Sequence, residues 1–200
     1  LAQVAITLGH VELRAGNLDQ AYRIASETLV RFRELVNPRG EAASERLAAM
    51  VALGRGDLGA AFRHALSTFS LYNQRIADPW GRVEGSLLLA QVALAEGSLQ
   101  RAQEHLREAE TTQVDEAEPV QHRHLTAAWL AFASGKPDQA YEHILQARRA
   151  FPDVRRTGDH TPLLLRRLTP LAQQTPSALL LAEWQQLLDT SATSTPLPLP

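Results

Sequence analysis

The sequence predicts an all-α protein built as a solenoid of antiparallel helix pairs. The first observation is a turn-like string that opens on a glycine and recurs at spacings of 40, 41 and 38 residues. A period in this range is typical of helical repeat arrays. The second observation is that apolar and small residues follow a helical spacing on both sides of each string, whereas alternating β-branched runs are absent. The strings begin at Gly16, Gly56, Gly97 and Gly135.

A polar residue followed by proline marks three predicted helix starts with the same period. Proline suits the first helical turn, because its missing N–H is not needed there and its fixed φ is compatible with a helix. We therefore expect the residue before each proline to be an N-cap. The pairs are Asn37-Pro38, Asp78-Pro79 and Glu118-Pro119.

Together the glycines and prolines predict the helix bounds. The helix pair around Gly16 is expected to open on a truncated helix, so we expect the chain to be part of a longer protein. The other predicted pairs are residues 38–53 and 58–74, residues 79–96 and 99–111, and residues 119–134 and 137–150.

The pattern loosens towards the C-terminus. Pro162 predicts the start of a further helix, which Pro170 is expected to break early. A last helix is predicted over residues 177–188, with Trp184 covering the end of the stack. The expected organisation is four helix-pair repeats in residues 1–152, capping helices in residues 153–189, and a disordered tail, rich in Thr, Ser and Pro, in residues 190–200.

Small residues recur at fixed distances from the turn glycines. Seven residues before them stand Gly9, Ala49, Ala90 and Ala128, and five residues after them stand Ala21, Ala61, Ala102 and Ala140. In this pattern residues 2–152 resemble the tetratricopeptide repeat, although the units are longer than its usual period of about 34 residues. Such lengthened units are similar to those in the helical arms of large bacterial transcriptional regulators. The resemblance implies a right-handed superhelix with a concave groove lined by the first helix of each pair.

Composition and motifs narrow the function classes. A net charge of −2 and a pI near 6.4 provide no field for a polyanion, so we expect no direct nucleic-acid binding by this segment. No apolar run approaches the length of a membrane span, and we expect a cytoplasmic protein without cofactor or metal. Residues 54–59 match the dinucleotide fingerprint, but a helix rather than a strand precedes them, which favours a plain turn.

The histidines do not predict a metal site. His122 and His124 are two residues apart and point to different sides of a helix, whereas helical ligand pairs use i, i+4. Polar neighbours predict solvent-facing positions on second helices for three others, His64, His105 and His143.

By the tetratricopeptide resemblance, a partner would bind the inner face of the first helices. This face is largely apolar, which favours a protein or amphipathic peptide as partner. The alternative for its large apolar side chains, Trp129 and Phe132 included, is that they are core. The candidate partner-binding residues are His10, Arg14, Arg46, Met50, Gln91, His122, Trp129 and Phe132.

Two functions stay open at this stage. The first is a non-catalytic scaffold that mediates protein or peptide binding as part of a larger bacterial protein. The second is the effector-sensing arm of a transcriptional regulator that binds a small molecule. Self-association is a further possibility, because residues 104–118 are strongly acidic and residues 148–167 strongly basic.

Overall fold

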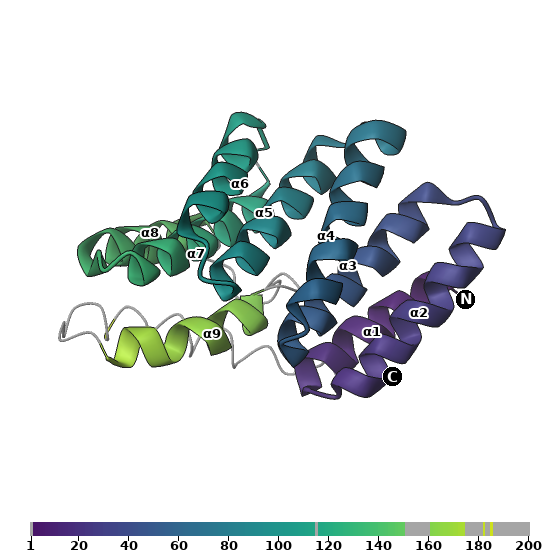
Figure 1. The fold of residues 1–200 in the computed structure, drawn as a ribbon, viewed down its shortest axis with the longest axis horizontal. Coiled ribbons are helices and arrows are strands. Elements are labelled where there is room, and N and C mark those ends of the chain that lie inside the picture. Colours follow the sequence, from purple (N-terminus) through teal and green to yellow (C-terminus); the bar gives the residue numbers. More distant parts are fainter. Residues whose placement is uncertain (1, 115, 151–160, 175–181, 183–184, 186–200) are drawn as a thin grey trace. The chain divides into compact units, whose positions relative to one another are not determined.

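The computed structural model describes residues 2–114, 116–150 and 161–174, together with Ala182 and Gln185. These residues are helical apart from short turns, and no strand occurs among them (Figure 1). The predicted all-α class is confirmed.

The chain divides into two compact units, Leu1–Val114 and Asp115–Pro200. The predicted domain limits at residues 152 and 189 fall outside the described residues. Unit 1 contains α1 (Ala2–Ala15), α2 (Leu18–Glu34), α3 (Pro38–Arg55), α4 (Leu58–Ser70), the π-helix η1 (Leu71–Ile76), α5 (Pro79–Ala95) and α6 (Leu99–Thr111). Unit 2 contains α7 (Ala117–Ala133), α8 (Pro137–Ala150) and α9 (Thr161–Gln173).

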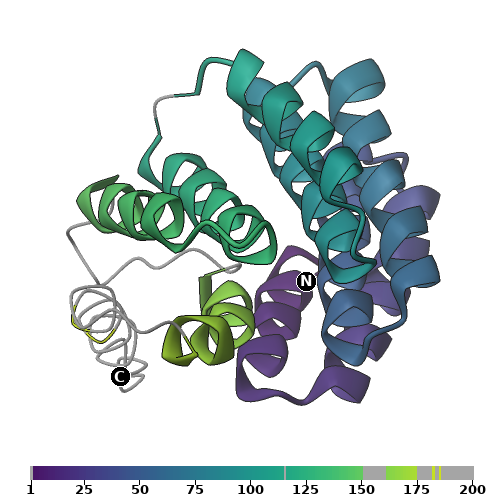
Figure 2. The ribbon, with the colours of Figure 1, turned by 60° about the vertical axis from the view of Figure 1, so that its left-hand side comes forward.

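Each helix of unit 1 packs against its neighbours along the chain, from α1 to α6 (Figures 1 and 2). α3 and α5 form the inner layer, because residues 44–53 of α3 and residues 83–94 of α5 are buried without a break. The even-numbered helices α2, α4 and α6 bury only one apolar stripe each. In unit 2, α7 packs against both α8 and α9.

The four predicted turns share one geometry. Gly16, Gly56, Gly97 and Gly135 have φ values of 85°, 78°, 77° and 69°. At the second turn the Gly56 N–H donates to the Leu53 carbonyl and the Asp57 N–H to the Ala52 carbonyl, and the same two bonds recur at the other three. This is the Schellman arrangement, in which a left-handed residue satisfies the last carbonyls of a helix. Glycine therefore occupies these four positions because their φ is positive.

Two of the three predicted N-caps are confirmed. The Asn37 side chain accepts from the Gly40 N–H, and the Asp78 side chain accepts from the N–H groups of Trp80 and Gly81. The prediction for Glu118 is wrong, because α7 already begins at Ala117 and Glu118 lies in its first turn. The longer glutamate side chain is a poor cap, but its negative charge is favourable inside the first turn.

The buried alanines explain how closely the paired helices approach. Ala21, Ala61, Ala102 and Ala140 are each at most 1% exposed. We expect Ala61→Leu and Ala102→Leu each to lower the free energy of unfolding by about 1–3 kcal/mol, because the added methylenes overpack the helix pair. Urea denaturation measures the change. Two neutral substitutions would contradict this account of the alanines.

Val36 occupies a left-handed turn position without being a glycine. Its φ is +50°, and its N–H donates to the Arg33 carbonyl while the Asn37 N–H donates to that of Phe32. A β-branched residue is strained in this conformation. Val36→Gly is therefore expected to raise the free energy of unfolding by about 0.5–1 kcal/mol, measured by urea denaturation. Val30→Gly, at an exposed helical site, is the control and should lower it by roughly 0.5 kcal/mol.

The predicted break at Pro170 is wrong, since α9 continues to Gln173. Proline removes the hydrogen bond to the carbonyl of Arg166, but both residues are exposed on the outer side of the helix, where water can satisfy that carbonyl. The helix then closes normally, because the Gln174 N–H donates to the Pro170 carbonyl at 3.2 Å. The predicted helix over residues 177–188, Trp184 and the tail over residues 190–200 lie outside the described residues.

Glycines also face aromatic rings of the preceding helix, a recurrence that the sequence prediction missed. A Cβ atom on Gly40 would lie 2.2 Å from the Phe32 ring, and one on Gly81 would lie 2.1 Å from the Tyr72 ring. The rings thus lie directly against the helix backbone. Tyr72 belongs to η1, where a regular α-helix was predicted as far as residue 74.

Candidate functional site

The eight candidate partner-binding residues are divided between the two units. His10 and Arg14 lie on α1, Arg46 and Met50 on α3, and Gln91 on α5, whereas His122, Trp129 and Phe132 lie on α7. Six of them are buried within the chain, with exposed fractions from 1% for Met50 to 9% for Arg46. Arg14 is exposed and Phe132 half-buried. The buried six contribute to packing, and their part in binding stays a prediction.

Arg46, one of the buried candidates, pairs with groups of α5 inside the protein. Its Nη1 lies 3.8 Å from Oε2 of Glu84, a carboxylate on α5 whose side chain is fully buried. Its guanidinium also lies over the Trp80 ring, 5.4 Å from the ring centre. The arginine therefore joins α3 to α5 and compensates a buried negative charge.

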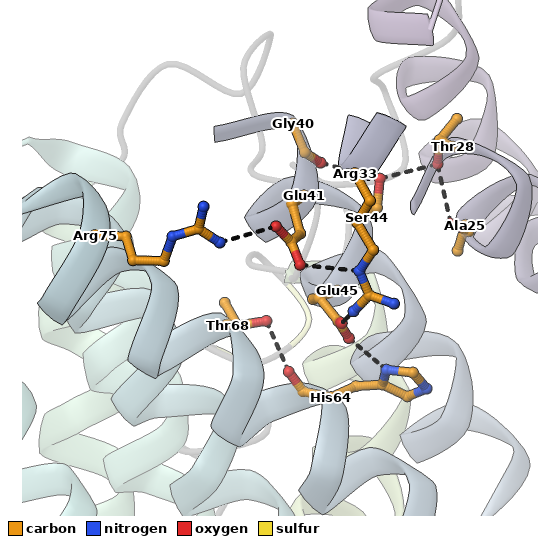
Figure 3. A network of polar contacts seen from close by, with 10 residues as sticks. All are labelled: Ala25, Thr28, Arg33, Gly40, Glu41, Ser44, Glu45, His64, Thr68 and Arg75. Atoms are coloured by element: carbon orange, nitrogen blue, oxygen red, sulfur yellow. Dashed lines mark hydrogen bonds and ion pairs between the residues drawn. The ribbon is translucent and has the colours of Figure 1, made fainter. Parts of the chain in front are cut away.

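A polar pocket of about 210 Å³ opens in unit 1, and none of the eight candidate residues lines it. Its centre is a pair of carboxylates one turn apart on α3, Glu41 and Glu45, and its walls come from α2, α4 and η1 (Figure 3). The lining residues are Arg33, Glu41, Glu45, Ser67, Ser70, Leu71, Gln74 and Arg75.

A chain of ion pairs holds the pocket together (Figure 3). Arg33 of α2 donates from Nε to Glu41 at 2.9 Å and from Nη2 to Glu45 at 2.8 Å. Arg75 of η1 donates to the second oxygen of Glu41 at 3.2 Å. Nδ1 of His64, on α4, lies 2.6 Å from Glu45. Four helical segments are thus bound through two carboxylates.

The two carboxylates of the pocket are more buried than its two arginines. The Glu45 side chain is 4% exposed and that of Glu41 15%, whereas Arg33 and Arg75 are 54% and 52% exposed. The carboxylates are therefore structural anchors, and the two arginine side chains that pair with them remain about half exposed to solvent. Guanidinium forks recognise carboxylates and phosphates, and the serine hydroxyls and the glutamine amide of the wall add neutral hydrogen-bonding groups. The arrangement is suited to binding a small polar group.

Sequence reasoning missed this pocket. Glu41 and Glu45 are spaced i, i+4 on a predicted helix, which is the one local signal. Their partners lie 8 to 34 residues away and depend on packing. His64, predicted to face the solvent, has a side chain that is 21% exposed and a ring that contacts the buried Glu45.

A histidine pair lies between α7 and α8 in unit 2. Nδ1 of His124 is 3.3 Å from Nδ1 of His143, and the ring centres are 5.6 Å apart. His143, also predicted to face the solvent, is half-buried. Burial, with smaller effects of His143 and Arg123, lowers the pKa of His124 from 6.5 to about 4.

The lowered pKa of His124 predicts acid sensitivity. Between pH 6.5 and 4 the unfolded chain binds a proton at this residue that the folded chain does not, so stability falls as the pH falls. We expect a loss of about 1–2 kcal/mol between pH 7 and pH 4.5, reduced from the full shift because the ring is partly exposed. Urea denaturation at both pH values checks this. His124→Gln should lose correspondingly less, and identical losses in both proteins would contradict the prediction.

Comparisons with protein-family models, curated proteins and solved structures give no match for this chain. Among the described residues no group of three His, Cys, Asp or Glu could hold a metal ion. In the same part of the chain, no helix is both long and apolar enough to cross a bilayer. The fold itself defines the class: an all-α protein whose consecutive helices pack in pairs.

Proposed function

We propose that the chain is a non-catalytic helical scaffold that binds a protein or an amphipathic peptide. The supporting observation is that large apolar side chains remain exposed at helical spacing in unit 1. Phe62 and Leu66, one turn apart on α4, are 38% and 44% exposed, and three more follow one another along α1. Exposed apolar side chains one helical turn apart are a surface that an amphipathic helix can bury.

The tetratricopeptide resemblance leads to the same expectation. In this proposal the chain is a cytoplasmic segment of a larger bacterial protein, and its helix pairs form a repeat array. The buried candidates Arg46, Met50 and Trp129 keep the first helices in place, while Arg14 and Phe132 remain accessible to a partner. Alanine substitution of these three buried residues would therefore lower the stability of the protein and would not test binding directly.

Selection from a displayed library of random peptides tests the proposal with the complete 200-residue chain. The expected result is enrichment of sequences with apolar residues at i, i+3 or i+4, and i+7, which bind the purified chain but not a urea-unfolded sample. Failure to enrich any sequence over uncoated support, or equal binding to the unfolded chain, would contradict the scaffold function.

The polar pocket supports the second candidate, the effector-sensing arm of a transcriptional regulator. Arg33 and Arg75 present half-exposed guanidinium groups in a space that suits a ligand of only a few heavy atoms. A thermal-shift screen with small carboxylates and phosphates tests it. A stabilising compound should lose its effect in Arg75→Ala, and a screen in which no compound stabilises the wild type would contradict this candidate.

A further inference from the structure

The polar pocket of unit 1 offers more hydrogen-bond donors than acceptors to a ligand (Figure 3). Each of the four carboxylate oxygens of Glu41 and Glu45 already has a nitrogen partner within the chain. A guanidinium group has five N–H groups. Within the described residues Arg33 uses two of them and Arg75 uses one. The two arginines, each about half exposed, therefore keep donors that a ligand can use.

The rest of the pocket wall adds neutral polar groups and one apolar side chain. Ser67, Ser70 and Gln74 make no side-chain hydrogen bond with another residue in the described part of the chain. Among the described lining residues only Leu71 is apolar, and it is 7% exposed. A wall of this composition suits a polar ligand that carries no more than a short hydrocarbon group.

The charges of the pocket limit the charge of its ligand. The two carboxylates and the two guanidinium groups of the lining cancel, so the lining has no net positive charge to compensate a dianion. Glu41 lines the same space as the arginines and repels any anion that they attract. A second negative charge on the ligand doubles this repulsion, whereas a planar carboxylate already satisfies a guanidinium fork with two hydrogen bonds.

We infer that the pocket binds a free monocarboxylate with a short alkyl chain, whose oxygens accept hydrogen bonds from Arg33 and Arg75. This inference rests on the second candidate function, the sensing of a small molecule, and names its ligand class. Bound in this way, the carboxylate uses the remaining N–H groups and joins α2 to η1, while the ion pairs to Glu41 stay in place. A space of about 210 Å³ favours a small free acid over a longer chain.

An NMR chemical-shift titration of the complete chain tests the inference with propionate, propionamide and inorganic sulfate, at neutral pH and constant ionic strength. We expect saturable binding of propionate. Propionamide has nearly the same shape without the charge, and it should bind at least about tenfold more weakly. Sulfate is a dianion, and it should also bind at least about tenfold more weakly.

Arg75→Gln locates the site. It keeps part of the side-chain stem and removes the charged donors, so we expect propionate to bind at least about tenfold more weakly. Arg39→Gln is the matched control, because Arg39 is another exposed arginine with one ion pair, to Asp78, and lies outside the pocket lining. It should keep the affinity within about twofold. Circular dichroism verifies that both variants are folded, and the comparison of propionate with propionamide needs only the wild type.

The outcomes that overturn the inference differ from those that overturn the candidate function. Equal affinity of propionate for Arg75→Gln and wild type removes this pocket as the binding site. If sulfate binds as tightly as propionate and Arg75→Gln abolishes both, the sensing of a small molecule stands and the monocarboxylate inference fails. If neither compound binds the wild type and no compound of the thermal-shift screen stabilises it, the candidate function fails as well.

Discussion

Gly85→Ala is expected to lower the free energy of unfolding by about 2–3 kcal/mol, although alanine is the better helix former. The reason is the distance between α5 and α4. The added Cβ atom would lie 2.7 Å from Cα and 2.9 Å from N of Phe69, and backbone atoms cannot rotate away as a side chain can. The two helices would have to separate, which opens the inner layer of unit 1. Urea denaturation monitored by circular dichroism measures the effect.

Gly59→Ala, on the neighbouring helix α4, is the matched control. Its Cβ atom would have Arg63 as nearest neighbour at 3.6 Å, an ordinary contact. The same chemical change should therefore stabilise the protein by about 0.5 kcal/mol through the lower backbone entropy of the unfolded chain. Opposite signs for the two substitutions are expected, and a Gly85→Ala protein as stable as wild type would refute the close contact of α4 with α5.

Arg46→Met is expected to destabilise the protein by about 3 kcal/mol. The substitution leaves Glu84 with its side chain buried and without the cation 3.8 Å from its Oε2. Most of the cost comes from that carboxylate, because methionine fills much of the space of the arginine stem. Thermal and urea denaturation of the single variant measure the loss.

The Arg46→Met, Glu84→Gln double variant separates charge from packing. Removing the negative charge should restore part of the stability, so the double variant is expected to be more stable than Arg46→Met alone. A double variant less stable than the single one would show that Glu84 is held by its other contacts. Either result also shows how far Arg46, proposed from sequence as a binding residue, serves to keep the fold intact.

Helix ends were predictable because local chemistry determines them. Asn37 and Asp78 cap α3 and α5 with their own side chains, and the left-handed turn at Gly56 ends α3. These signals act over a few residues and can be recognised in a single sequence. Glutamate at position 118 is a weak N-cap signal, and there the predicted helix start was wrong, because α7 already begins at Ala117.

The candidate site was less predictable, because burial is decided by neighbours distant in sequence. The helical pattern places Met50 on one face of α3, but residues 44–53 of α3 are buried on every face, so the Met50 face is not separately accessible. The pocket around Glu41 depends on Arg33 and Arg75, and Arg75 is presented by a π-helix that no local pattern predicts. Widened helical turns of this type occur frequently at functional sites.

The torsion-dependent turns have a consequence for the cooperativity of unfolding. At Gly56, Gly97 and Gly135 an added Cβ atom would meet no atom within 4 Å, so alanine there costs only backbone energy, about 1 kcal/mol. Each junction between paired helices can therefore be weakened by a similar amount without altering the faces on either side. Alanine variants at the three sites therefore weaken the junctions of three helix pairs one at a time. Comparing their unfolding distinguishes local opening of one helix pair from unfolding of the whole protein.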